Sequence, residues 1–230
     1  MIPKKIHYVW VGGKDKPKNI KKCMRTWKKH LEGYEIIEWN ESNFDINSHP
    51  FVKAAYKAKK WAYVSDYIRM WAIYKYGGIY LDTDVLVLDS FDRFLKDKAF
   101  VGYENANFPF TACFGAEKGH AFIKKVLDYY DKLDRYKFDF KNNNTISVSD
   151  ILIKDFGCKK GNIEQTLKTG IKVYKDDVLC NPSKNSVTIH IFTGTWLDNK
   201  KGLKRKIATN LKLSLNTKFK AEMYRKFFSR

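Results

Sequence analysis

Apolar and polar positions in the N-terminal part of the chain follow the pattern of a strand, a helix and a second strand. Residues 6–11 form a short apolar run rich in β-branched and aromatic side chains, which is typical of a buried strand, and Gly12-Gly13 ends it. Residues 19–31 place apolar side chains at helical spacing, and residues 34–39 repeat the strand pattern. A strand, a helix and a strand in this order predict two parallel strands joined by a helical crossover.

The same two patterns continue through the rest of the chain. Residues 50–76 are predicted to be mainly helical, because Pro50 suits a first turn and apolar positions recur at helical spacing until Gly77-Gly78. Further strands are predicted at residues 79–81, 85–88, 100–103, 111–115, 171–174 and 187–192, further helices at residues 120–133 and 145–156, and a polar loop at residues 138–144. This mixture of strands and helices predicts an α/β fold.

The pattern changes near the C-terminus, where apolar residues fall at every fourth position and basic residues lie between them. The apolar positions are Leu203, Ile207, Leu211, Leu215, Phe219, Met223 and Phe227. Residues 198–230 contain eleven lysines and arginines against two acidic residues, which predicts a basic amphipathic helix with a break near Asn216. We therefore expect two parts, a domain over residues 1–198 and a basic helical tail over residues 199–230.

Length and composition narrow the class of protein. A chain of 230 residues suits one α/β domain with a small appendage, and its net charge of +19 favours nucleic acid, anionic lipid or a phosphorylated substrate as partner. The four cysteines form no CxxC pair, which favours buried thiols in a reducing cytoplasm over a zinc site. Because the chain has no apolar run of about 18 residues and no signal-peptide pattern, we expect a cytoplasmic protein.

The most informative segment for chemistry is residues 76–84, where the apolar strand Ile79-Tyr80-Leu81 stops at Asp82-Thr83-Asp84. Two carboxylates at positions i and i+2 of a strand end can both reach a hard cation and a ribose. Mg²⁺ or Mn²⁺ bound there would neutralise a diphosphate as it leaves. The alternative interpretation is a solvent-facing turn that is acidic by chance.

A second motif, Ser65-Asp66-Tyr67-Ile68-Arg69, lies one helix earlier. Asp66 and Arg69 are three residues apart and share a helix face that is otherwise apolar. A charged pair on such a face needs partners or a ligand. In one interpretation the two residues form a helix salt bridge. In the other, Asp66 accepts hydrogen bonds from sugar hydroxyls, while Arg69 holds Asp66 and contacts sugar or phosphate.

Four segments together resemble one family. They are Val9-Trp10-Val11-Gly12-Gly13, Ser65-Asp66-x-x-Arg69, Gly77-Gly78-Ile79-Tyr80-Leu81-Asp82-Thr83-Asp84 and His190-Ile191-Phe192-Thr193-Gly194-Thr195-Trp196. In this order and spacing they resemble the DXD-containing glycosyltransferases, which include bacterial capsular polysaccharide sugar transferases, fungal initiating mannosyltransferases and the catalytic domains of large clostridial glucosylating toxins. Thr195 stands where this family usually has serine, and it keeps the hydroxyl.

The resemblance implies a GT-A-like fold, a Rossmann-type mixed sheet flanked by helices, and transfer with retention of anomeric configuration. The implied catalytic residues are Asp66, Arg69, Asp82 and Asp84, and the implied ligands of Mn²⁺ or Mg²⁺ are Asp82, Asp84 and His190. The implied nucleotide-sugar contacts are Val9, Trp10, Asp66, Arg69, Tyr80, Asp82, Thr83, Thr195 and Trp196, with Trp10 stacked on the base and Trp196 closing over the donor. The alternatives are a core tryptophan at Trp10 and a strand histidine bonded to a backbone carbonyl at His190.

The resemblance also implies a function. We expect a hexosyltransferase that uses a nucleotide sugar, with a UDP-hexose favoured, and a saccharide acceptor that is lipid-linked, in capsule or other surface polysaccharide synthesis. Residues 104–119, with Asn105, Asn107, Thr111 and Glu117, are expected to line the acceptor side. Residues 200–230 would dock peripherally on the anionic inner face of the cell membrane, or else pack their leucines on the domain while the lysines stay solvated.

A second class of function is a metal-dependent nucleic-acid-binding or nuclease-type protein, which the charge and the aromatic content permit. Without a metal, however, Asp82 and Asp84 would repel phosphate. A nuclease would also need further acidic residues, and none clusters at a suitable place in the sequence. We therefore expect no nucleic-acid partner.

Overall fold

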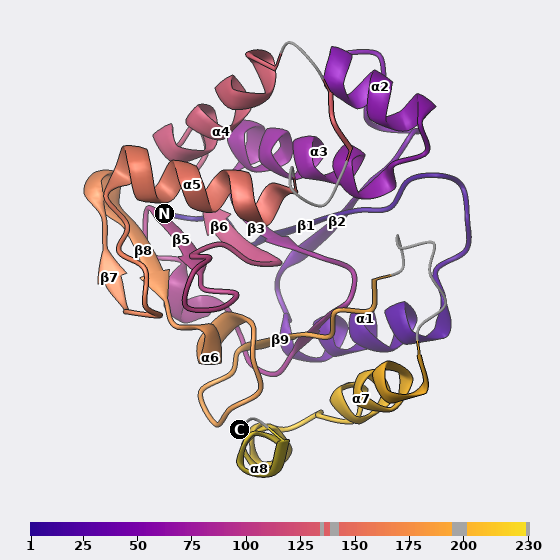
Figure 1. Cartoon of the computed structure of the whole chain (residues 1–230), viewed down its shortest axis with the longest axis vertical. Coiled ribbons are helices and arrows are strands. Elements are labelled where there is room, and N and C mark those ends of the chain that lie inside the picture. The colour runs from indigo at the N-terminus through magenta and orange to yellow at the C-terminus, as the bar shows by residue number, and fades with distance from the viewer. Residues whose placement is uncertain (134–135, 139–142, 195–201, 229–230) are drawn as a thin grey trace.

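The computed structural model describes residues 1–133, 136–138, 143–194 and 202–228. In this part of the chain helices lie on both sides of a central sheet (Figure 1). The strands are β1 (Lys5–Val9), β2 (Glu35–Trp39), β3 (Gly78–Leu81), β4 (Val85–Val87), β5 (Ala99–Gly102), β6 (Cys113–Ala116), β7 (Gln165–Thr166), β8 (Ile171–Tyr174) and β9 (Thr188–His190). The α-helices are α1 (Lys18–His30), α2 (Pro50–Lys57), α3 (Trp61–Tyr76), α4 (Ala121–Asp131), α5 (Asn144–Phe156), α6 (Asp176–Leu179), α7 (Leu203–Leu213) and α8 (Lys218–Phe228).

The central sheet is mixed, with the strand order β2-β1-β3-β6-β5-β8-β7. β1 is parallel to β2 and to β3, and β5 is parallel to β8, whereas β6 is antiparallel to both β3 and β5. β4 and β9 form a separate antiparallel pair. The predicted parallel pair with a helical crossover is confirmed by β1, α1 and β2, and so is the predicted mixed sheet flanked by helices.

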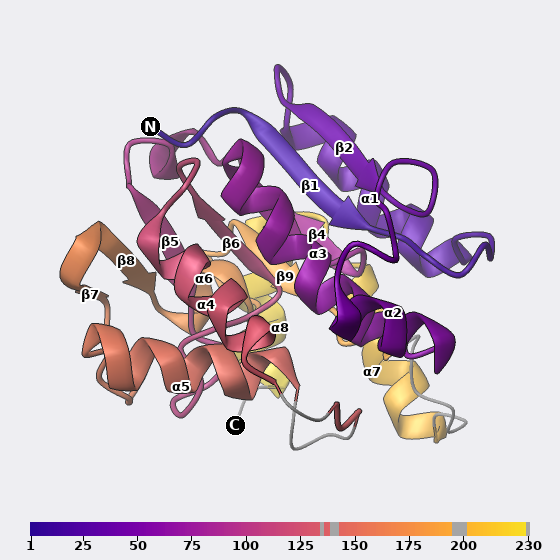
Figure 2. The same cartoon turned by 90° about the horizontal axis from the view of Figure 1, so that it is seen from above.

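Three apolar clusters hold these layers together. The first lies between the sheet and the helices α2, α3, α4 and α5, and the second lies on the opposite face, under α1 and α6 (Figure 2). A third, smaller cluster joins the tail to α1, β4 and β9. Its members from the tail are Leu213, Leu215 and Ala221, so α7 and α8 are built onto the body of the protein.

The observed elements differ from the predicted ones in a few places. The segment 50–76 is two helices, because Lys59 adopts a φ of +55° between α2 and α3. The predicted break in the tail is confirmed, since α7 ends at Leu213 and α8 begins at Lys218. Burial in the tail departs from the predicted stripe, because Ile207 is 51% exposed. In the predicted loop 138–144, residues 139–142 lie outside the described residues.

Gly77 and Gly78 connect α3 to β3 directly, with φ values of +64° and +116°. A Cβ atom at Gly78 would lie 2.7 Å from the carbonyl oxygen of Lys5 and 2.9 Å from Nε2 of His7. Only glycine therefore lets β3 lie this close to β1. Because the chain turns back immediately, the end of β3 faces the helix that carries the second motif.

Candidate active site

The two sequence motifs meet at the end of β3, where Arg69 lies between two carboxylates. Its Nη2 is 3.0 Å from Oδ1 of Asp66 and 3.3 Å from Oδ1 of Asp82. The side chains of Asp66 and Arg69 are each 9% exposed, whereas that of Asp82 is 26% exposed. The helix salt bridge therefore exists, but it is buried and extends to the strand-end carboxylate, and Asp82 is the member that a ligand can reach.

A line of hydrogen bonds fixes Asp82 from a second direction. Arg69 donates to Oγ of Ser65 at 2.9 Å, and the hydroxyls of Ser65 and Tyr80 lie 2.9 Å apart. Tyr80 then donates to Oδ1 of Asp82 at 3.0 Å, while the guanidinium of Arg69 lies 4.6 Å from the centroid of the Tyr80 ring. Because Tyr80 is fully buried, these contacts orient Asp82 before any ligand arrives.

Asp66 is a carboxyl group with an altered pKa. Burial raises the pKa of Asp66 to about 7, with the Arg69 guanidinium opposing the change and Asp82 adding to it. Burial therefore makes the protonated form of this carboxyl group more accessible than it is in an exposed aspartate. Such a group can accept a hydrogen bond from a hydroxyl, or donate one to it.

Asp84 is held by the segment that follows β9. Oδ2 of Asp84 accepts hydrogen bonds from the backbone N–H of Thr193 at 2.7 Å and from its hydroxyl at 2.9 Å, and Oδ1 lies 3.4 Å from Nε2 of His190. Burial alone would raise the pKa of Asp84, but His190 and the two donors of Thr193 outweigh it and hold the pKa well below its ordinary value. Burial alone would lower the pKa of His190, yet Asp84 raises it well above its ordinary value.

Asp82, Asp84 and His190 converge at one point. One ligand atom from each residue can be chosen so that all three atoms lie within 4.8 Å of one another. Nδ1 of His190 is buried and has no hydrogen-bond partner among the described residues. Two carboxylates and an imidazole are a donor set that suits Mn²⁺ or Mg²⁺, so the residues present fit the ion expected from the sequence.

The segment after His190 has an unusual backbone. Phe192 adopts a φ of +57°, which is uncommon for a residue with a side chain, and its ring lies 3.8 Å from the ring of His190. This turn aims Thr193 at Asp84. Thr195 and Trp196, which the resemblance assigned to the donor, lie outside the described residues.

Three other residues that were expected to contact the nucleotide sugar, Val9, Trp10 and Thr83, lie in different surroundings. Val9 is buried in the core on the α3 side of the sheet. Trp10 packs at the edge of the core on the opposite side, where its indole N–H donates to the carbonyl of Lys14 at 2.6 Å and Lys16 lies 5.5 Å from a Trp10 ring centroid. Thr83 is half-buried between the two aspartates. Donor binding by these residues stays a prediction.

A cavity of about 490 Å³ lies near the start of α3 and was not predicted. It is lined by Gly12, Lys14, Tyr56, Lys57, Lys59 and Trp61. Trp61 lies one helical turn before Ser65, so the cavity continues the face of α3 that carries Ser65 and Arg69. The spacing of Trp61, Ser65 and Arg69 is the signal by which it could have been found.

Glu104 begins the segment 104–119 that was expected to line the acceptor side, although no individual role was assigned to it. It follows β5 at the same edge of the sheet at which Asp82 follows β3. Burial raises its pKa, and the charges of His190 and Asp82 act on it in opposite directions. Glu117 was expected to lie on this side as well, but it follows β6 at the other edge, where it pairs with the N-terminal amine at 3.6 Å.

Comparison with known proteins agrees with this geometry. Residues 17–101 match the family described as the glycosyltransferase sugar-binding region containing the DXD motif. This region includes Asp66, Arg69, Asp82 and Asp84. Over these residues the chain is similar to the DXD-containing glycosyltransferases, the family that the four motifs resemble.

The chain also has a similar protein among fungal mannosyltransferases, at low sequence identity. Inositol phosphoceramide mannosyltransferase 3 of Schizosaccharomyces pombe is 29% identical over 146 residues, which cover 60% of this chain and 39% of that protein. The chain thus matches about two fifths of the length of this relative.

Two solved structures show the fold. The PaToxG glycosyltransferase superposes with a TM-score of 0.53 at 19% identity, covering 67% of this chain and 69% of that one. The glycosyltransferase GlyE of Streptococcus pneumoniae TIGR4 superposes with a TM-score of 0.50 at 12% identity, covering 98% of this chain and 63% of that one. The GT-A-like fold expected from the sequence is confirmed.

Proposed function

We propose that this chain is a metal-dependent, retaining glycosyltransferase that moves a hexose from a nucleotide sugar, with a UDP-sugar favoured, to a saccharide acceptor. The observation that carries the proposal is the convergence of Asp82, Asp84 and His190 beside the buried pair of Asp66 and Arg69. Packing does not explain such a group, because burying charges is costly unless they are paired or bind a ligand.

In the proposed metal site, some residues bind the ion and others hold those ligands in position. Asp82, Asp84 and His190 would hold Mn²⁺ or Mg²⁺, which supplies positive charge against the diphosphate. Thr193 holds Asp84 by two hydrogen bonds, and Tyr80 and Arg69 hold Asp82. Partners of this kind fix the ligands in place, so less reorganisation is needed when the ion binds.

The nucleotide fits along one face of α3. Trp61, Ser65 and Arg69 occupy successive turns and span roughly 12 Å at a rise of about 1.5 Å per residue. The base would lie in the cavity beside Trp61 and Gly12, where aromatic and basic side chains surround it. The diphosphate and the sugar then lie near Arg69 and Asp82.

The remaining polar groups suit the sugar and the acceptor. Asp66 accepts hydrogen bonds from the donor sugar, and its altered pKa makes either direction of hydrogen bonding available. Glu104 lies on the acceptor side and binds an acceptor hydroxyl. For the transfer we follow the route implied by the resemblance, in which the leaving phosphate itself helps to deprotonate the acceptor hydroxyl while the site supplies orientation and electrostatic stabilisation.

A donor screen tests this proposal. The purified protein with Mn²⁺ is incubated with UDP-glucose, UDP-galactose and GDP-mannose, and slow hydrolysis is followed. GDP-mannose belongs in the panel because the fungal relative is named a mannosyltransferase. We expect one donor to be hydrolysed, with activity lost in Asp84→Asn and retained in Asp128→Asn, a surface control on α4. No turnover of any donor, together with no metal-assisted nucleotide binding by calorimetry, would overturn the proposal.

The acceptor is proposed to be lipid-linked, and the tail to dock on an anionic inner membrane surface from the cytoplasm. Among the described residues no helix has both the length and the apolar character that a membrane crossing requires. The tail nevertheless exposes large apolar side chains, with Phe219, Phe227 and Phe228 at 75%, 69% and 62% exposure. Lys220, Arg225 and Lys226 lie on the same helix, and basic residues near such apolar groups favour anionic lipid.

Co-sedimentation with vesicles tests the docking. We expect binding to vesicles containing anionic phosphatidylglycerol, weaker binding to vesicles of phosphatidylcholine alone, and loss of binding in the Phe219→Ser, Phe227→Ser variant. A matched control is Ile163→Ser, which removes an exposed apolar side chain far from the tail in sequence. Equal partitioning of all three proteins would overturn the docking proposal and leave the proposed reaction standing.

A further inference from the structure

Lys212 of α7 is a half-buried cation beside the segment that follows β9. Its Nζ lies 5.1 Å from the centroid of the Phe192 ring, and that ring lies 3.8 Å from the ring of His190. Burial lowers the pKa of Lys212, whereas Cys180 and Asp84 act in the opposite direction. The ammonium group is therefore close enough to the site to experience the charge of Asp84.

This cation is unusual among the basic residues of the tail. Lys218 pairs with Asp89 at 2.5 Å and Arg225 pairs with Asp177 at 3.3 Å, both in partly exposed positions. Lys212 has no ion pair within the described part of the chain, although it is the more buried group. An ammonium group that is partly removed from water and has no anionic partner carries a desolvation cost, and an anion that binds at the site would offset that cost.

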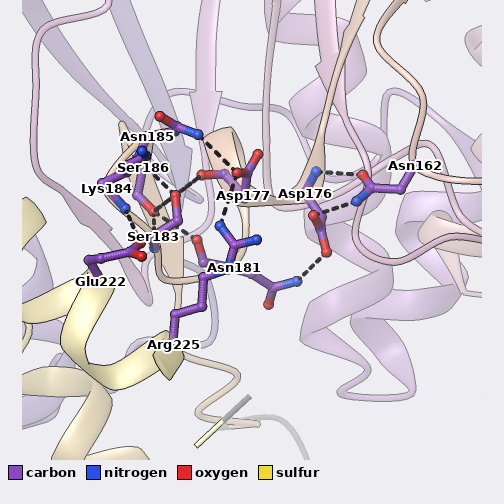
Figure 3. Close-up of polar contacts among 10 residues, drawn as sticks. All are labelled: Asn162, Asp176, Asp177, Asn181, Ser183, Lys184, Asn185, Ser186, Glu222 and Arg225. Atoms are coloured by element: carbon purple, nitrogen blue, oxygen red, sulfur yellow. Dashed lines mark hydrogen bonds and ion pairs between the residues drawn. The ribbon is translucent and has the colours of Figure 1, made fainter. Parts of the chain in front are cut away.

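α8 fixes the position of the helix that carries Lys212. Figure 3 shows Arg225 of α8 reaching Asp177, and Glu222 accepting a hydrogen bond from the backbone of Lys184 at 3.0 Å. Leu213 and Leu215, which follow Lys212 in the chain, are buried in the apolar cluster that joins the tail to α1, β4 and β9. The backbone of Lys212 therefore belongs to a helix that is packed against the rest of the protein.

We propose that Lys212 binds the diphosphate of the donor and holds it as it leaves, so that α7 is part of the active site. This inference rests on the proposed function. A nucleoside diphosphate released from its sugar carries more negative charge than one divalent ion neutralises, and Arg69 is already committed to Asp66 and Asp82. Lys212, beside the ring of Phe192, supplies the missing positive charge as a point cation.

Calorimetry on three variants of the whole chain tests the inference, without vesicles and with Mn²⁺ present. The titrants are UDP and UMP, or the guanosine pair if the donor screen selects GDP-mannose. We expect Lys212→Met to weaken diphosphate binding by about 10- to 100-fold and to change monophosphate binding far less. Lys212→Arg keeps the charge and should retain most of the affinity, and Lys206→Met, an exposed lysine of the same helix, should bind like the unsubstituted protein.

Thermal unfolding without ligand separates this role from a structural one. Because Lys212→Met removes an unpaired, half-buried charge and keeps most of the length of the side chain, the variant should unfold at the same or a higher temperature. Unchanged diphosphate affinity would overturn the inference, and so would an equal loss of both affinities together with a lower unfolding temperature. If the unsubstituted protein binds neither nucleoside diphosphate, the proposed function itself fails, and the inference fails with it.

Discussion

Thr193 directs both of its donors at one oxygen of Asp84, with the backbone N–H at 2.7 Å and the hydroxyl at 2.9 Å from Oδ2, although 109 residues separate them. The other oxygen, Oδ1, is left to face His190 at 3.4 Å. One half of the carboxylate therefore serves orientation, and the other half is free to bind a cation. This relationship makes the segment after β9 part of the proposed metal site even though Thr193 itself offers no ligand.

Removing the hydroxyl of Thr193 should weaken metal binding without abolishing it. Thr193→Val keeps the side-chain shape and the backbone donor, so we expect roughly 10-fold weaker Mn²⁺ binding, at the lower end for partners that orient metal ligands. Thr193→Ser keeps both donors and serves as the control. Calorimetric titration of Mn²⁺ in the presence of nucleotide measures the effect, and equal affinities in the two variants would show that orientation by the hydroxyl is unimportant.

Removing Arg69 should destabilise the fold, because it leaves the buried Asp66 and the half-buried Asp82 without their cation. For Arg69→Met we expect a loss of about 3–5 kcal/mol in the free energy of unfolding, measured by urea denaturation. Lys124→Met removes the cation of an exposed pair with Asp128 on α4 and should change the free energy of unfolding far less. Similar losses in both variants would mean that the burial of Arg69 carries no special cost.

Local patterns predicted those parts of the site that depend on short stretches of chain. The i,i+3 spacing of Asp66 and Arg69 predicted a shared helix face, and the end of an apolar strand predicted the position of Asp82. The meeting of the two motifs was implied by the family resemblance, and the structure shows that Gly77-Gly78 make the immediate turn between helix and strand. These features depend on backbone period and on glycine, both of which can be read from the residues themselves.

Contacts between residues that are far apart in the sequence could not be predicted from local patterns. The bond from Thr193 to Asp84 depends on the positive φ of Phe192, and a phenylalanine gives no local signal for that conformation. The tail pattern predicted a stripe through Ile207, yet Leu213 is buried and Ile207 is half exposed. Helical period identifies the faces of a helix, but the surface that a face meets is set by tertiary packing.

Gly78 should tolerate no side chain. In Gly78→Ala the new Cβ would meet the Lys5 carbonyl at 2.7 Å while the backbone keeps a φ of +116°, so overpacking and strain add together. We expect a loss of more than about 2 kcal/mol in the free energy of unfolding. Gly119→Ala has a φ of +75° but no atom within 4 Å, and it isolates the backbone strain at about 1 kcal/mol. Equal losses in urea denaturation would contradict the steric argument.

His7 should make stability depend on pH in a defined window. Its Nδ1 faces the indole N–H of Trp39, which can only donate, at 3.1 Å, so Nε2 carries the proton and donates to the carbonyl of Gly77 at 2.8 Å. Burial lowers the pKa of His7 from 6.5 to about 4, with the Gly77 carbonyl opposing the change. The neutral ring is therefore favoured in the folded state, whereas the unfolded chain takes up a proton at higher pH.

The sign of the His7 effect follows from this difference. Its contribution to stability is fully present above pH 6.5 and is lost as the pH falls through about 4, and the two pKa values correspond to about 3 kcal/mol. Asp66, with its pKa raised to about 7, raises the stability of the folded state as the pH falls, which is the opposite of the His7 effect. The test therefore compares two proteins that both contain Asp66, so that its contribution cancels. His7→Gln can keep both hydrogen bonds and does not titrate. Urea denaturation between pH 7 and pH 4 should show the unsubstituted protein losing stability relative to His7→Gln, and parallel curves would show that the neutral histidine contributes nothing to the pH dependence.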